Sequence, residues 1–265
     1  MRILAIGDIF GEPGRKALHA LLPGLVQRHR VDFVVVNVDN AAGGKGITDK
    51  IADEMFVLPI QVMTAGNHVW EQSSIFGHLE SHPILRPYNV VGTHPGKGYC
   101  IASGKNGVPV AVIHLQGKVF MENKGVQVTS PFRPADALLK ELEGQVQVVL
   151  VDLHAEVTAE KRAVGWYLDG RVSAVLGTHT HVQTSDEEIM PGGTAYITDM
   201  GMTGPHQSVI GLEPAVAIER FLSEGQVKKF KVASLGARLE GVLLDIDENS
   251  GKARKIERVR EIFKQ

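Results

Sequence analysis

Short apolar runs alternate with amphipathic stretches along the chain. Several runs have the length of buried strands, at residues 2–6, 33–36, 60–63, 146–151 and 172–176. Helical patterns lie between or after them, at residues 15–29, 48–57, 135–143, 158–169 and 214–224. We expect Pro23 to break or kink the first of these helices, and Thr158 to cap the fourth. Because strands and helices alternate, the pattern predicts a parallel sheet whose ligands bind beyond the carboxyl ends of the strands.

Other parts of the chain show the patterns of antiparallel pairs and loops. Hairpins are predicted at residues 98–115 and 232–263, short strands at 188–190 and 194–198, and loops at 116–133 and 199–205. No internal repeat or linker is evident. We therefore expect residues 1–265 to form a single domain, with a possible small insertion or cap around residues 92–130.

Polar side chains stand at the ends of the predicted strands. The candidate metal ligands are Asp8, Asp39, Asn40, Asn67, His154, His179 and His181, with His68 beside them. If extended geometry continues past residues 172–176, His179 and His181 point to one spot, because side chains two apart share a face. Two carboxylates, two amides and four histidines do not fit a single tetrahedral zinc ion. They are enough for two metal ions that share a bridging carboxylate.

Each candidate also has an ordinary structural interpretation. Asp8 could cap a helix, Asn40 and Asn67 could occupy turns, and His154 could be a buried core histidine. The combination favours a metal centre, because chance would have to put every group at a strand end. Mixed nitrogen and oxygen ligands suit iron, manganese or zinc, and the sequence does not choose among them. The glycine-rich loop of residues 43–46 is not a P-loop, and we expect its backbone to approach the metal cleft.

Composition narrows the class of protein further. The chain of 265 residues is 43% hydrophobic and 22% charged, which is ordinary for a globular domain. A net charge of −2 argues against an extended nucleic-acid surface, although it allows a small nucleotide or an RNA end as the partner. The single cysteine, Cys100, forms no internal disulfide, and neither a signal peptide nor a membrane span is evident. We therefore expect a cytoplasmic protein without a membrane partner.

Together these motifs resemble a known family. Gly7-Asp8, Asp39-Asn40, Gly66-Asn67-His68, the lone His154 and the GTHTH sequence of residues 177–181 resemble, in order, the motifs of calcineurin-like metallophosphoesterases. More narrowly, GDIFGEPGR at 7–15, NAAGG at 40–44, THTHVQT at 178–184 and ITDMGMTGP at 197–205 are similar to the bacterial YmdB-type branch. The resemblance covers nearly the whole chain. It implies an α/β fold, a four-layer α/β/β/α sandwich, and a two-metal centre, often di-iron.

The resemblance also implies an activity and roles for the residues. The activity is hydrolysis of 2′,3′-cyclic nucleotides, or related small phosphodiesters, by a metal-bridging hydroxide. One ion is implied to be held by Asp8, Asn40 and His181, the other by Asn67, His154 and His179, with Asp39 as the bridge. His68 is implied to be the general acid at the leaving oxygen or a phosphate ligand.

The chain departs from the family pattern at two positions. Phe10 stands where the wider superfamily has a histidine, and Asn40 can fill the gap. Asp39 stands where the branch typically has glutamate, so the bridging side chain is shorter by one methylene. Two alternatives stay open. One is a phosphomonoesterase or nucleotidase on the same centre, and the other, which the shorter bridge keeps open, is a nucleotide-binding regulatory protein of low turnover. A homo-oligomer is possible in each case.

Overall fold

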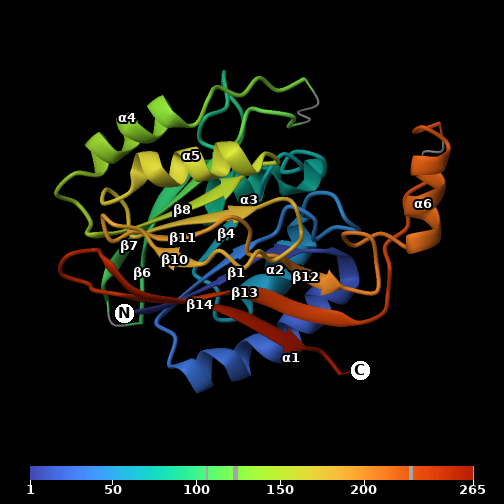
Figure 1. Ribbon diagram of the computed structural model, residues 1–265, viewed down its shortest axis with the longest axis horizontal. Helices are drawn as coiled ribbons and strands as arrows, with labels where there is room; N and C mark the ends of the chain where they lie inside the picture. Colours follow the sequence, from blue (N-terminus) through green and yellow to red (C-terminus); the bar gives the residue numbers. More distant parts are fainter. Residues whose placement is uncertain (106, 122–124, 227–228, 265) are drawn as a thin grey trace.

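The described residues of the structure, a computed structural model, are 1–105, 107–121, 125–226 and 229–264, and they form two stacked β-sheets (Figure 1). The larger sheet has eight strands in the order β2-β12-β13-β1-β3-β4-β5, with β14 paired to β13. Its strands are β1 (Arg2–Ile6), β2 (Asp8–Ile9), β3 (Phe33–Asn37), β4 (Val62–Thr64), β5 (Ile84–Leu85), β12 (Met202–Pro205), β13 (Ala237–Ile246) and β14 (Ala253–Ile262). Strands β1, β3, β4 and β5 run parallel, as the alternation of strands and helices predicts.

The second sheet has six strands in the order β10-β11-β9-β8-β7-β6. Its strands are β6 (Tyr99–Ser103), β7 (Pro109–Gln116), β8 (Val148–His154), β9 (Ala174–Thr178), β10 (Glu188–Ile189) and β11 (Ala195–Ile197). Neighbours from β7 to β11 are parallel, and the edge strands β6 and β10 are antiparallel. The carboxyl ends of β8 and β9 therefore lie at one edge of this sheet.

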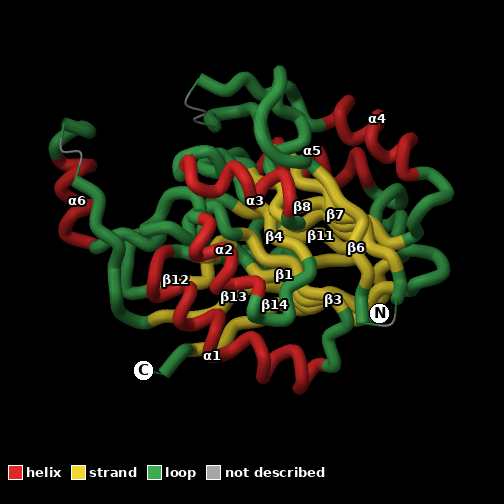
Figure 2. Tube along the Cα trace, turned by 180° about the vertical axis from the view of Figure 1, so that it is seen from behind, coloured by secondary structure: helices red, strands yellow, loops and turns green. Residues whose placement is uncertain are grey.

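Helices cover the outer face of each sheet (Figure 2). The helices next to the larger sheet are α1 (Gly11–His29), α2 (Asp49–Phe56) and α3 (Phe76–Ser81), the last preceded by a 3-10 turn, η1 (Ser73–Ile75). The helices on the second sheet are α4 (Phe132–Leu142) and α5 (Thr158–Leu168), whereas α6 (Pro214–Leu222) projects away from the body of the molecule (Figure 1). Among the described helices, none combines the length and the apolar character that a membrane span requires.

Three apolar layers hold these elements together. Leu4 and Ile6 of β1 pack with the α1 side of the larger sheet, whereas Ile3 and Ala5 of the same strand pack between the sheets. This alternation follows from the two-residue period of a strand. A further layer, which includes Leu138 of α4, covers the outer face of the second sheet. The order of layers is thus α/β/β/α, which confirms the predicted four-layer sandwich.

Several predicted elements differ in their bounds. Helix α1 begins at Gly11 and runs through Pro23, whose exposed ring leaves Leu22 and Leu25 buried on the core side. The prediction that Pro23 breaks the helix is therefore wrong. Helix α5 has Val157, not Thr158, at its N-cap position, and no side chain caps it.

The predicted loops and hairpins have mixed outcomes. Part of the loop predicted at residues 199–205 is strand β12, which pairs with β2 and β13. The hairpin of β13 and β14 is confirmed, as is the pairing of β6 with β7, although Asn106 in its turn lies outside the described residues. Residues 122–124 of the predicted loop at 116–133 also lie outside them. The division of the chain into domains stays a prediction.

Candidate metal centre

The strand ends bring the predicted ligands together in one buried cluster. Asp8 begins β2 directly after β1, and Asn40 follows the end of β3. Asn67 follows β4, His154 is the last residue of β8, and His179 follows β9. Residues that are far apart in the sequence thus meet where the carboxyl ends of strands from both sheets face each other.

One part of the cluster surrounds His181. Its Nε2 atom lies 3.2 Å from Asn40 Oδ1 and 3.8 Å from Asp8 Oδ1. The Asn40 amide donates a 3.0 Å hydrogen bond to the carbonyl of Gly44, which turns Asn40 Oδ1 toward the histidine. His181 Nδ1 donates to the carbonyl of Ile210 at 3.0 Å, so in the neutral ring the lone pair is on Nε2. Two acceptors, Nε2 and Oδ1, therefore face each other.

Phe10 lies beside this part of the cluster. Its ring meets the ring of His181 edge-on, with centroids 5.3 Å apart and an interplanar angle of 78°. Phe10 is 3% exposed and packs with Met202 and Leu212. It supports a candidate ligand from the side, while Asn40 supplies the oxygen on the same part of the cluster.

The other part of the cluster surrounds His154. Its Nε2 atom lies 3.1 Å from Asn67 Oδ1 and 3.1 Å from His179 Nδ1. The main chain at Gly66 passes so close that a Cβ atom there would be 2.2 Å from His154 Cδ2. Only glycine fits at this close contact. The contact holds the His154 ring against the main chain at the residue just before Asn67.

Hydrogen bonds to the outer nitrogen set the tautomer of His154. Its Nδ1 lies 3.0 Å from Thr178 Oγ1, and that hydroxyl donates to Asp152 Oδ1 at 2.7 Å. Since the hydroxyl proton goes to Asp152, Thr178 accepts the Nδ1 proton of His154. The Nε2 lone pair of the neutral ring then points into the cluster, as in histidines that bind metal ions.

His179 is oriented in the same way. Its Nε2 lies 3.0 Å from Glu156 Oε2, so the ring donates to that carboxylate and directs its Nδ1 lone pair at His154. Burial, with the nearby rings of His154 and His181, lowers the pKa of His179 to about 2. Burial also lowers the pKa of His181. Both rings are therefore neutral near pH 7, which is the form that binds a metal.

Two aspartates each turn one oxygen into the cluster. Asp8 Oδ2 accepts a 3.1 Å hydrogen bond from the His179 amide, and Asp39 Oδ1 accepts a 2.9 Å bond from the His68 amide. The other oxygens, Asp8 Oδ1 and Asp39 Oδ2, are buried and have no hydrogen-bond partner among the described residues. Asp39 Oδ2 lies 3.2 Å from His154 Nε2. The shorter side chain of Asp39 thus still reaches the centre of the cluster.

The two aspartates respond differently to burial. Burial and the negative charge of Asp199 raise the pKa of Asp8 well above its usual value. Burial acts in the same direction on Asp39, but the charged forms of His154 and His68, together with the His68 amide, outweigh it and hold the pKa of Asp39 below the usual range. Each carboxylate therefore depends on nearby positive charge to remain ionised in the cluster.

Lone pairs that face one another at about 3 Å repel unless a cation lies between them. Here imidazole nitrogens, amide oxygens and unpaired carboxylate oxygens converge without donors among them, and the outer atoms are satisfied elsewhere. The residues therefore fit a metal centre, and their mixed nitrogen and oxygen donors suit iron, manganese or zinc.

The backbone at the histidine pair is not extended, contrary to the prediction. His179 and His181 have φ angles of 96° and 64°, in the left-handed region. Asp199 holds the turn, because its Oδ2 accepts bonds from the amide and hydroxyl of Thr180 at 3.0 and 2.7 Å. Lys161 lies 2.8 Å from the same oxygen, and both members of this ion pair are buried. The two rings reach their places through this support rather than through strand geometry.

Asp152 is a supporting residue that the sequence did not reveal as such. It accepts hydrogen bonds from Thr178, Thr64 and Asn37, the last at 3.0 Å. Burial alone would raise the pKa of Asp152, but His114 and the hydrogen bonds hold it at about 2. The spacing offered a signal, because Asp152 lies two residues before His154 on the same face of β8.

A cavity of about 240 Å³ opens beside the cluster. Its lining includes His179, His181, Gly44, Lys45 and His68. His68 Nδ1 lies 3.3 Å from Glu71 Oε1, and the histidine side chain is 22% exposed. The glycine-rich loop of residues 43–46 therefore borders the cleft, as expected from the sequence.

A separate group of possible metal ligands lies on the surface at α2 and α3. Ligand atoms of Asp53, His78 and His82 all lie within 4.8 Å of one another. His78 Nε2 is 2.9 Å from Asp53 Oδ1, and the rings of His78 and His82 stack with centroids 4.6 Å apart. The sequence pattern indicates no role for these residues, because neither histidine follows a predicted strand.

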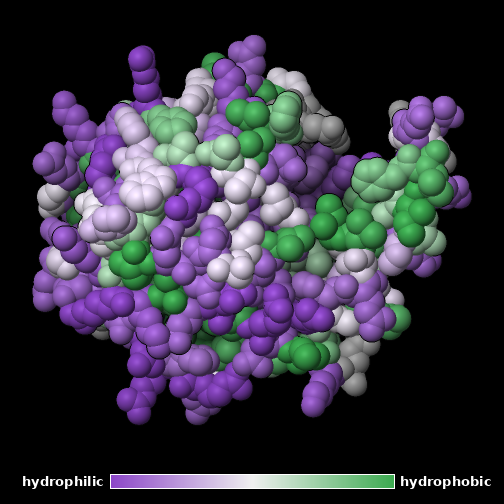
Figure 3. Space-filling view, in the orientation of Figure 1, coloured by the Kyte–Doolittle hydropathy of each residue, from purple (hydrophilic) through white to green (hydrophobic). Residues whose placement is uncertain are grey.

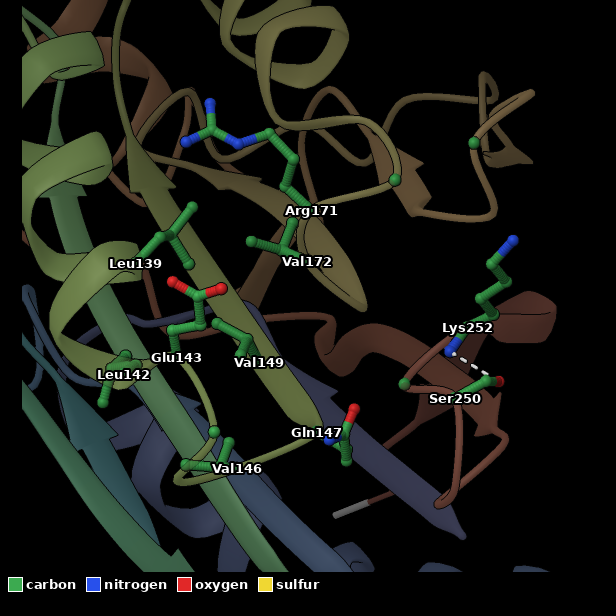
Figure 4. A pocket seen from close by; sticks show the side chains of 14 residues that line it. Leu139, Leu142, Glu143, Val146, Gln147, Val149, Arg171, Val172, Ser250 and Lys252 are labelled. Carbon is green, nitrogen blue, oxygen red and sulfur yellow. Dashed lines mark hydrogen bonds between the residues drawn. The ribbon is translucent and has the colours of Figure 1, made fainter.

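Another cavity, of about 320 Å³, lies beyond the amino ends of β8 and β9 (Figure 4). Glu143, Gln147, Arg171 and Lys252 are among its lining residues. It contains none of the predicted ligands. The candidate metal ligands lie at the opposite, carboxyl ends of these strands.

Comparison with known proteins agrees with this geometry. A 2′,3′-cyclic-nucleotide 2′-phosphodiesterase of Bacillus subtilis (strain 168) is 44% identical over 260 residues, which cover 98% of this chain and 96% of the relative. The crystal structure of a novel phosphatase of Mycoplasma pneumoniae superposes with a TM-score of 0.91, at 31% identity over 99% of this chain and 93% of that one.

More distant structures share the fold alone. A 5′-nucleotidase of Candida albicans SC5314 superposes with a TM-score of 0.59, at 13% identity over 98% of this chain and 50% of that one. The family model described as YmdB-like protein matches residues 4–259. The chain therefore belongs to the YmdB-like protein family.

Proposed function

We propose that this protein is a phosphodiesterase that opens 2′,3′-cyclic nucleotides with the help of two divalent metal ions. The observation that carries the proposal is the convergence of acceptor atoms without donors, from strands of both sheets, beside a cleft. The identity to a 2′,3′-cyclic-nucleotide phosphodiesterase over nearly the full length of both chains supports the substrate class. A free cyclic nucleotide or an RNA end that carries a cyclic phosphate would fit the same chemistry.

In this proposal Asp8, Asn40 and His181 would hold one ion, Asn67, His154 and His179 would hold the other, and Asp39 would be a ligand of both. The bound ions would supply a water of lowered pKa as the nucleophile and would offset negative charge on the phosphoryl oxygens. We propose iron as the metal, because the family resemblance implies it. Manganese and zinc are alternatives, since the mixed nitrogen and oxygen donors suit all three metals.

The residues of the chain would orient the reaction. Thr178, Glu156 and the carbonyl of Ile210 hold the outer nitrogens of the three ligand histidines and so fix their direction. His68 lines the cleft and would protonate the leaving ribose oxygen, with its Nδ1 held by Glu71. Opening of the cyclic ester breaks one bond from phosphorus to a ribose oxygen and leaves a phosphomonoester on the other.

A substrate panel with matched variants tests this function. Wild-type protein purified without oxygen should open adenosine 2′,3′-cyclic phosphate faster than it hydrolyses 3′-AMP, and bis-p-nitrophenyl phosphate faster than p-nitrophenyl phosphate. Elemental analysis of the same sample should find two metal ions per chain. Asp39→Asn should abolish turnover. Faster monoester cleavage would favour a nucleotidase, and tight nucleotide binding with background turnover would favour a regulatory protein. A cytoplasmic location and a homo-oligomer remain predictions.

A further inference from the structure

The wall of the cleft differs from its floor. The floor includes His179 and His181 of the polar cluster, whereas one wall is apolar and is formed by Phe10, Ile210, Leu212 and Phe230. Phosphate and metal chemistry do not need such a wall. A substrate that carries an apolar, flat group beside its phosphate would use it.

Phe230 is the outer member of a series of rings that starts at a candidate metal ligand. Phe10 meets His181 edge-on at 5.3 Å, and Phe230 stacks on Phe10 with centroids 6.5 Å apart and an angle of 24°. Phe10 is 3% exposed but Phe230 is 40% exposed, so the outer ring still presents surface at the cleft. Lys45 Nζ lies 5.3 Å from the centroid of Phe230 and adds a positive charge at the rim.

The glycine-rich loop is shaped around this ring. Gly44 has a φ of 96°, and a Cβ atom there would be 2.7 Å from Phe230 Cζ and 3.0 Å from Phe10 Cζ. The same residue accepts the hydrogen bond of the Asn40 amide through its carbonyl. The position of the Phe230 ring is thus tied to the side chain that faces His181.

We propose that Phe230 is the platform on which the nucleobase of the substrate stacks, with Lys45 as the cation beside it; this inference rests on the proposed function. In a 2′,3′-cyclic nucleotide one ribose separates the phosphate from the base. The ring of Phe10 separates His181 from Phe230 in the same way. Stacking on an aromatic side chain tolerates every base, because each has a flat π-face. The site therefore accepts purine and pyrimidine nucleotides and discriminates against phosphodiesters without a base.

The test compares Phe230→Ala with Phe230→Trp and the control Phe221→Ala. Phe221 is 81% exposed on α6, where apolar side chains gather on the surface (Figure 3), and it does not line the cleft. The substrates are adenosine 2′,3′-cyclic phosphate and the 2′,3′-cyclic phosphate of methyl riboside, which lacks a base. Phe230→Ala should raise KM for the nucleotide about tenfold or more, and much more than it lowers kcat. For the cyclic phosphate of methyl riboside, the same variant should leave KM nearly unchanged, so that the rise in KM is about tenfold smaller than for the nucleotide. Phe230→Trp should restore the KM for the nucleotide.

The outcomes separate this inference from the proposed function. Equal effects of Phe230→Ala on both substrates, or no effect on either, would overturn the stacking platform. A wild-type enzyme that opens neither substrate would contradict the proposed function instead. In that case, equilibrium dialysis of the cyclic nucleotide against the same variants still decides the inference. Loss of affinity in Phe230→Ala, restored in Phe230→Trp, supports the platform, and unchanged affinity refutes it.

Discussion

Two groups of histidine and aspartate in this protein look alike in composition but differ in their surroundings. In the cleft, His154 and His179 meet Asp39, and on the surface His78 and His82 meet Asp53. In the cleft, each ring donates its outer proton to a protein acceptor and directs its lone pair inward. On the surface, His78 pairs with Asp53 itself, so the candidate ligand atoms satisfy each other. Partners behind the ligands, rather than the ligands alone, distinguish a preorganised centre.

The largest expected effect follows from a change in the cleft. His154→Ala should remove at least one metal ion and lower phosphodiesterase turnover by more than about 1,000-fold. Loss of a residue that only supports a metal ligand already lowers metal affinity or activity by about 10- to 100-fold, and loss of the ligand itself should cost more. Elemental analysis and the rate with a cyclic nucleotide measure both effects. His78→Ala is the matched control on the surface. Two ions and normal turnover in His154→Ala would remove the distinction between the groups.

The buried ion pair behind the histidine turn should have the next largest effect. Lys161→Met leaves Asp199 buried without its cation and should lower the free energy of unfolding by about 3–5 kcal/mol. Urea unfolding of the metal-loaded protein measures this loss. Lys140→Met on the exposed face of α4 is the control and should change little. Equal stability of the two variants would mean that the pair does not support the cleft.

The acceptor behind His179 should have an intermediate effect. Glu156→Ala removes the partner of Nε2 and should weaken the affinity for one metal ion by about 10- to 100-fold. Glu156→Gln keeps an acceptor oxygen and should retain most of the affinity. Competition with a chelator of known affinity measures both variants. If both behave like the wild type, the orientation of His179 does not depend on Glu156.

The smallest effect is expected at the surface group. His82→Ala and His78→Ala should change the free energy of unfolding by less than about 0.5 kcal/mol, as is usual for positions at the surface and outside the core. The metal content and turnover of the cleft should also stay the same. A third tightly bound ion that both variants lose would show that the surface group is a metal site of its own.

The sequence predicted where the ligands meet, because parallel strands place their carboxyl ends at one edge. This rule places Asp8 and Asn67 at one edge of the larger sheet and His154 at one edge of the second sheet, and the stacking of the two sheets brings these edges together. The position of each strand end depends on periodicity and chain order, which are local properties of the sequence. The order of the layers, by contrast, was implied by the family resemblance and not by the alternation of elements.

The parts that the sequence did not reveal depend on contacts between distant residues. The turn with left-handed backbone at His179 and His181 is held by Asp199 and Lys161, whose roles no local pattern indicates. Pro23 remains within α1 because the apolar residues around it are buried against the sheet, which outweighs its local preference. Strand β12 forms in a glycine-rich segment because β2 and β13 offer free edges on either side.

The hydrogen bond from Asn40 to Gly44 has a consequence for how this enzyme could diversify. One short loop shapes both the cradle for the cation and the seat of the Phe230 ring. A lineage that adapts to a new nucleotide through this loop would alter its metal affinity at the same step. Divergence of substrate preference should therefore proceed more readily at Ile210 and Leu212 of the same apolar wall, where only the carbonyl of Ile210 contacts a candidate ligand.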